Sequence, residues 1–87
     1  MIRKRLMVNC PIGLQVEPAG ILCERAVQFK SKITVEYEGG TANAKSILSI
    51  LGAVIKHGDQ ITLICEGPDE EEAMQDIAEV LEKKLAV

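Results

Sequence analysis

Two hydrophobic periodicities alternate along the sequence, and their order restricts the folds that the chain can adopt. Alternation at every second residue predicts strands, most clearly over 60–66, where Ile61, Leu63 and Cys65 share one face. Apolar residues spaced three and four apart predict helices instead. The elements expected, in order, are strands over 2–8, 31–37, 41–44 and 60–66 and helices over 16–29, 46–55 and from 69 onward.

This β-α-β-β-α-β-α order predicts an α+β fold, an open-faced sandwich in which three helices cover one face of a four-stranded antiparallel sheet. A length of 87 residues suffices for one hydrophobic core, so we expect a single domain over 1–87. Phe29 and Tyr37 are the only aromatic residues, and the core is therefore expected to be aliphatic.

The first and last helices carry start signals and buried stripes. Pro18 is acceptable in the first turn, where its missing N–H is not needed. Asp69 with Glu72 three residues later has the spacing of a capping box. The residues expected to be buried are Ala19, Leu22, Cys23 and Ala26 in the first helix and Met74, Ile77, Ala78, Leu81 and Leu85 in the last.

The middle helix begins at Ser46, where a polar run gives way to an apolar one. A serine here is a favoured N-cap, because its hydroxyl accepts a hydrogen bond from the first turn. The same serine is a plausible phosphorylation point, since the N-terminal end of a helix favours negative charge. Local chemistry alone favours the plain cap.

The middle helix is apolar nearly all round, although a short helix buries only one stripe. Ile50, Ala53 and Val54 are one candidate core set, which leaves Ile47, Leu48 and Leu51 as an exposed stripe. Periodicity alone equally allows a core of Ile47, Ile50, Leu51 and Val54.

Two stretches resemble the HPr family, the small phosphocarriers of the bacterial sugar phosphotransferase system. Asn43-Ala44-Lys45-Ser46-Ile47-Leu48 is similar to the family's pattern around its regulatory serine. Asn9-Cys10-Pro11-Ile12-Gly13-Leu14 is similar to the start of its catalytic loop. The resemblance spans essentially the whole chain in register, and it implies the same open-faced sandwich.

The second half of the catalytic loop departs from the family pattern. Gln15 stands where the family has its phosphate-accepting histidine, and Glu17 stands where it has an arginine that helps hold the phosphate. An amide nitrogen is not a nucleophile, because its lone pair is delocalised into the carbonyl. Glu17 replaces a cation with an acid, which repels phosphate. We therefore expect no catalytic residue, no phosphotransfer at position 15 and no enzyme activity.

The resemblance instead implies a regulatory protein like the catabolite-repression HPr-like proteins, phosphorylated on Ser46 by an HPr kinase/phosphorylase. It also selects Ile47, Leu48 and Leu51 as the exposed docking stripe. Gly20, Ile21 and Glu24, on the outer face of the first helix, are implied as further partner-binding residues. A transcriptional regulator is a family partner, but Glu17 argues against it because the family's arginine is expected to contact that regulator.

Composition excludes several other functions. The net charge of −3 argues against nucleic acid, and no run approaches the ~18 apolar residues of a membrane span. The N-terminus lacks the apolar region of a signal peptide, so we expect a cytoplasmic protein. Three cysteines without a CxxC spacing predict neither a disulfide framework nor a metal site, and no cofactor is implied.

Neither remaining candidate nucleophile has a partner in sequence. His57 lies in the polar turn after the middle helix and is expected to be a surface residue. Cys10 has no neighbouring base and is expected to be inert. A homodimer by edge-strand pairing or strand exchange is open to so small a sheet.

Overall fold

The predicted order of elements is confirmed in the computed structural model, which describes residues 1–86. The strands are β1 (Ile2–Met7), β2 (Lys32–Tyr37), β3 (Gly40–Asn43) and β4 (Gln60–Glu66), and the helices are α1 (Val16–Ala26), α2 (Ile47–Ala53) and α3 (Glu70–Glu79), with a π-helical turn, η1 (Val80–Lys84), continuing α3. All boundaries lie within three residues of those predicted.

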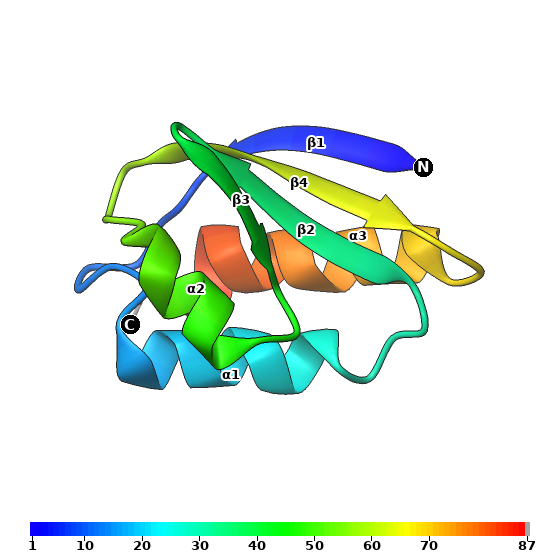
Figure 1. The fold of residues 1–87 in the computed structure, drawn as a ribbon, viewed down its shortest axis with the longest axis horizontal. Coiled ribbons are helices and arrows are strands. Elements are labelled where there is room, and N and C mark those ends of the chain that lie inside the picture. Colours follow the sequence, from blue (N-terminus) through cyan, green and yellow to red (C-terminus); the bar gives the residue numbers. More distant parts are fainter. Residues whose placement is uncertain (87) are drawn as a thin grey trace.

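The four strands form one antiparallel sheet in the order β1-β4-β2-β3. The three helices lie on one side of this sheet and leave its other face open, as Figure 1 shows. The fold class predicted from the sequence is therefore correct. The central strand β4 buries Ile61, Leu63 and Cys65 against the helices, in the alternation expected for a sheet with one covered face.

The aliphatic core follows the predicted helical stripes. Leu22 of α1 and Ile77 of α3 are fully buried, and every residue of the predicted α3 stripe is buried. In α1, Cys23 is only partly buried, because its side chain lies at the edge of the core, toward the start of α2. Among residues 1–86, no helix is long and apolar enough to cross a membrane.

The first helix ends at Ala26, three residues earlier than predicted. The amides of Gln28 and Phe29 donate to carbonyl groups three residues back, at Arg25 and Ala26, so the last turn tightens and α1 stops. The buried stripe had already ended at Ala26, and hydrophobic spacing carried no signal for the residues beyond it.

The predicted capping box at the start of α3 is wrong. Asp69 occupies the N-cap position, but its carboxylate makes no hydrogen bond within the helix. It accepts hydrogen bonds from the backbone amides of Lys30 and Ser31, each 2.9 Å long, and from the Ser31 hydroxyl. Asp69 therefore joins the start of α3 to the loop before β2, a long-range contact that local spacing does not reveal.

Candidate functional site

The loop before α1 packs against the exit of α2. Gly13 has a φ of +76°, and a side chain there would lie 3.0 Å from the Ile55 carbonyl oxygen. The amide of Leu14 donates to that same oxygen over 2.9 Å. Both the left-handed backbone and the close approach require glycine at this position. The contact fixes Gln15 beside the end of α2, although 40 residues separate them in sequence.

Gln15 and Glu17 both lie exposed at the start of α1. Gln15 is the N-cap residue, yet its side chain makes no capping hydrogen bond. Glu17 lies in the first helical turn, and within residues 1–86 its carboxylate forms neither an ion pair nor a hydrogen bond. The loop thus presents a neutral amide and an unpaired acid to solvent. The amide is not a nucleophile, and the negative charge of the acid opposes phosphate binding.

Ser46 caps α2, as predicted. Its hydroxyl oxygen accepts a hydrogen bond of 3.2 Å from the amide of Ser49. The hydroxyl of Ser49 in turn accepts from the amide of Asn43, over 2.8 Å. Because Asn43 ends β3, these two bonds join the strand to the first turn of the helix. Ser46 itself is half-buried.

The helix cap is also tied to α1. The Cys23 thiol donates to the carbonyl oxygen of Lys45 at 3.1 Å, and the Lys45 ammonium donates to the Phe29 carbonyl at 2.6 Å. Lys45 is therefore engaged with the backbone at the end of α1. The start of α2 is held from both the sheet and α1, which gives Ser46 a rigid setting.

The residues of the predicted exposed stripe of α2 differ in how much of each side chain is exposed. Leu48 is 82% exposed and Ile47 is 40% exposed, whereas Ile50 is fully buried. Leu51, predicted to be exposed, is half-buried and packs against the core. Neither core set proposed from the sequence matches fully, because the helix is only seven residues long and rests on the sheet through Ile50.

The prediction that Val54 is buried is wrong. Val54 ends the helix in the left-handed region, with φ 52° and ψ 51°, and it is 67% exposed. This conformation turns the chain out of the helical register, so the stripe does not continue through position 54. The next residue, Ile55, is the one that returns to the core. Ala53, also predicted to be buried, is partly buried.

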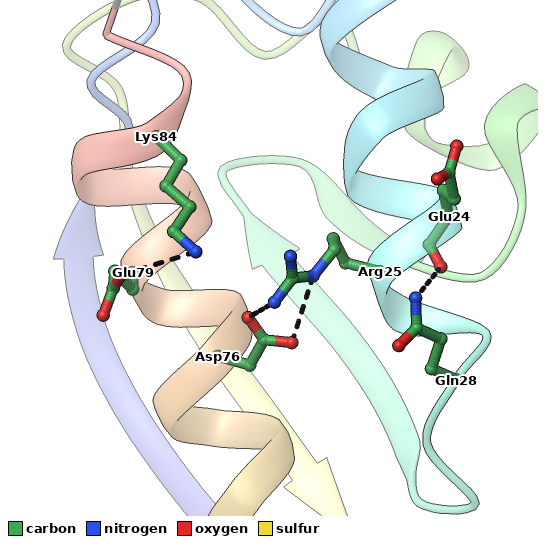
Figure 2. Close-up of polar contacts among 6 residues, drawn as sticks. All are labelled: Glu24, Arg25, Gln28, Asp76, Glu79 and Lys84. Carbon is green, nitrogen blue, oxygen red and sulfur yellow. Dashed lines mark hydrogen bonds and ion pairs between the residues drawn. The ribbon is translucent and has the colours of Figure 1, made fainter.

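Gly20, Ile21 and Glu24 are the residues of α1 predicted to bind partners. Ile21 and Glu24 are exposed, and a Cβ added at Gly20 would meet no atom of another segment within 4 Å. Figure 2 shows Glu24 directed away from α3, while Arg25 reaches Asp76 of α3 through two hydrogen bonds. That ion pair fixes the rotation of α1, so that Gly20, Ile21 and Glu24 remain on its accessible side.

The other candidate nucleophiles are not arranged for chemistry. Cys10 is buried, and its thiol donates to the Gly13 carbonyl at 3.2 Å. Burial, with the nearby Glu70 and Asp69, raises the pKa of the Cys65 thiol to about 11, which disfavours a reactive thiolate. His57 lies exposed in the turn after α2, as predicted. Within residues 1–86 there is no cluster of three or more potential metal ligands.

Four residues near Gln15 were not predicted from the sequence to be functional. Ile12, Val16, Val54 and Lys56 all line a shallow groove with Gln15, between the loop and the exit of α2. The signal that could have identified them is Gly13, since a loop glycine often marks a close approach of two backbone segments.

The open-faced sheet, with its three helices on one side, defines the class of small open-faced α+β sandwich domains. The family profile for the PTS HPr component phosphorylation site matches residues 2–83. The chain belongs to the HPr family. It is 40% identical to the HPr-like protein Crh of Halalkalibacterium halodurans over 84 residues, which cover 97% of this chain and all of that protein.

Two solved structures support the same assignment. HPr-C-His from Thermoanaerobacter tengcongensis is 32% identical, with a TM-score of 0.93, and the match covers 100% of this chain and 98% of that one. Crh, the Bacillus subtilis catabolite repression containing protein, is 33% identical, with a TM-score of 0.76 and 93% of each chain covered. That Crh structure is described as a dimer with a swapped domain.

Proposed function

We propose that this HPr-family protein is a regulatory protein of the bacterial sugar phosphotransferase and carbon catabolite control system, and not a phosphocarrier. A kinase of the HPr kinase/phosphorylase type phosphorylates Ser46, and the protein acts in the cytoplasm by binding other proteins. The observation that carries this proposal is the contrast between the two sites. Ser46 retains its capped, accessible setting, whereas the catalytic loop presents Gln15 and Glu17. The similarity to Crh of H. halodurans supports the same function.

The docking surface consists of Ile47 and Leu48 of α2, with a contribution from the half-buried Leu51. Gly20, Ile21 and Glu24 of α1 extend it. Exposed aliphatic side chains of this size, gathered beside a polar rim, are typical of protein-binding sites. Phosphate on Ser46 adds about −1.5 to −2 of charge next to Ile47, and so changes which partners can bind. The transcriptional regulator of the family is not proposed as a partner, because Glu17 replaces the arginine expected at that contact.

Intact-mass measurement after incubation with HPr kinase and ATP tests the proposal. The wild-type protein should gain one phosphate, and Ser46→Ala should gain none. Ser49→Ala is the matched control, because it removes a neighbouring hydroxyl of the same helix and leaves Ser46 in place. An unmodified wild-type protein would instead support a constitutive binding module in which Ser46 is only a cap. Phosphate on Ser46→Ala at the wild-type rate would place the modification elsewhere.

A homodimer is a second proposal, supported by the swapped dimer described for B. subtilis Crh. Among the described residues β1 is an edge strand paired with β4, so its exchange between two copies would break this pairing within each chain and re-form it between the chains. Size-exclusion chromatography with light scattering tests it. A single monomeric mass across the whole concentration range would refute it.

A further inference from the structure

Lys45, the residue before Ser46, has each of its three polar groups bonded to another part of the chain. Its amide donates to the side-chain oxygen of Asn43 over 2.9 Å. Its carbonyl oxygen accepts from the Cys23 thiol at 3.1 Å, and its ammonium donates to the Phe29 carbonyl oxygen at 2.6 Å. The first bond reaches the end of β3, whereas the other two reach α1 and the turn that follows it. Residue 45 is therefore fixed through both its main chain and its side chain.

The contact of the Lys45 ammonium is unusual for a lysine. This group is strongly hydrated, and it normally remains in water or beside a carboxylate. Lys45 is half-buried, and among the described residues it makes no ion pair. Its charge instead meets a neutral main-chain oxygen 16 residues earlier in the sequence. A lysine placed in this way ties two segments of the chain together.

This tether acts directly before the hydroxyl that the proposed function requires. The Ser46 amide donates to the Asn43 carbonyl oxygen over 3.0 Å, and the Ser46 hydroxyl oxygen accepts from the Ser49 amide over 3.2 Å. These two bonds come from the strand and the helix on either side of the serine. Lys45 and Cys23 add an attachment to a third element, α1, and so oppose a hinge motion of the connection between β3 and α2.

We propose that Lys45 is a positioning residue for the phosphorylation of Ser46, with Cys23 as its support from α1. The inference rests on the proposed function, since it concerns the same serine. In the reaction the Ser46 oxygen attacks the γ-phosphorus of ATP and forms a new O–P bond. The bond from that phosphorus to the bridging oxygen breaks, its electron pair leaves with ADP, and the hydroxyl proton passes to a base of the kinase. Lys45 takes no part in these steps, but holds the oxygen on the line of attack.

The tether should affect the chemical step more than the binding of the kinase. A displacement of a reacting group by about 1 Å can lower a rate by about 100-fold. Ile47 and Leu48, by contrast, keep their places on α2 because the helix rests on the sheet through the fully buried Ile50. Loss of the tether should therefore lower kcat and leave KM nearly unchanged.

Steady-state kinetics with an HPr kinase/phosphorylase and ATP, with this protein as the varied substrate, test the proposal. Lys45→Met keeps the aliphatic stem and removes the ammonium donor, so it should lower kcat about tenfold while KM changes by less than about twofold. Lys45→Arg retains a cationic donor and should recover most of the lost kcat. Lys32→Met is the matched control, because it removes the same charge from an exposed position on β2, and it should behave like wild type.

A second pair of variants acts on the bond from α1. Cys23→Ala removes the donor to the Lys45 carbonyl, whereas Cys23→Ser retains a donor of similar size. Cys23→Ala should lower kcat and Cys23→Ser should restore it, with KM again nearly unchanged. Hydrogen exchange of the Ser49 amide, followed by NMR well below the unfolding temperature, should be faster in Lys45→Met and Cys23→Ala than in wild type, because a loosened segment releases the cap more often.

An unchanged kcat for Lys45→Met would overturn the proposal. A rise in KM alone would also overturn it, because the kinase would then contact Lys45 directly. If wild type and Lys45→Met take phosphate on Ser46 equally well, the positioning role is rejected and the regulatory function stands. If the wild-type protein takes no phosphate, the regulatory function is rejected and the positioning role with it.

Discussion

An alanine series along α2 tests the proposed docking surface against the alternative that these residues belong to the core. Leu48→Ala, Ile47→Ala and Ile50→Ala remove similar volumes from positions that differ mainly in burial. Leu48 is 82% exposed, Ile47 is 40% exposed and Ile50 is fully buried. The three variants should therefore lose stability in that order.

The expected losses follow from the buried fractions. Full burial of a leucine or isoleucine contributes about 1.5–3 kcal/mol, so the 18% of Leu48 that is covered is worth only about 0.3–0.5 kcal/mol. The covered part of Ile47 is worth about 1–2 kcal/mol on the same scale. Ile50→Ala also leaves a cavity, and should cost about 2–5 kcal/mol.

Urea denaturation followed by far-UV circular dichroism measures these differences, provided that the dependence on urea is the same in all variants. Leu48→Ala should then be nearly as stable as wild type while its phosphorylation by HPr kinase is slowed. A loss of stability for Leu48→Ala as large as that for Ile50→Ala would place the stripe in the core. That result would remove the physical basis for the docking surface.

Three further predictions concern the polar sites. Hydrogen bonds from Ser31 and from the Lys30 amide lower the pKa of Asp69 from 3.8 to about 2. The stability that these bonds contribute is therefore complete above pH 4 and is lost as the pH falls toward 2. Urea titrations at several pH values should show this loss in the wild-type protein and not in Asp69→Asn. Gln15→His should restore at best weak phosphorylation by phosphoenolpyruvate and the upstream enzyme, measured as acid-labile phosphate on the protein. The double variant Gln15→His/Glu17→Arg should be phosphorylated more strongly. Full activity of the single variant would contradict the role given to Glu17. Ser46→Ala should lose about 1 kcal/mol of stability with the cap, whereas Ser46→Asp should retain it, as chemical denaturation can show.

The fold could be predicted because its signals are local and mutually consistent. The alternation of Ile61, Leu63 and Cys65 and the stripe from Met74 to Leu85 each follow from one element facing one core. The Ser46 cap is equally local, since its acceptor and donor lie three residues apart. Such features need no knowledge of the rest of the chain.

Of the features that were missed, one depends on a contact between distant segments and another on the way a helix ends. Asp69 has the spacing of a capping box, but the Ser31 amide and hydroxyl, 38 residues away, compete successfully for its carboxylate. The exposure of Val54 follows from the left-handed end of α2, where valine would not be expected from its conformational preference. Helical periodicity cannot report where a helix stops when the stop residue is itself apolar.

The seven-residue length of α2 limits how far along the helix a phosphate on Ser46 acts electrostatically. At about 1.5 Å per residue, roughly 12 Å along the helix axis separates Ser46 from Val54 at the exit of α2. The Debye length at physiological ionic strength is about 8 Å, so solvent screens much of the interaction between a Ser46 phosphate and the exposed Lys56. Ile47 and Leu48 lie within the first turn after Ser46, well inside that distance. Phosphorylation should therefore change the affinity of partners that contact the first turn of α2, and have little effect on contacts made only at the exit of the helix.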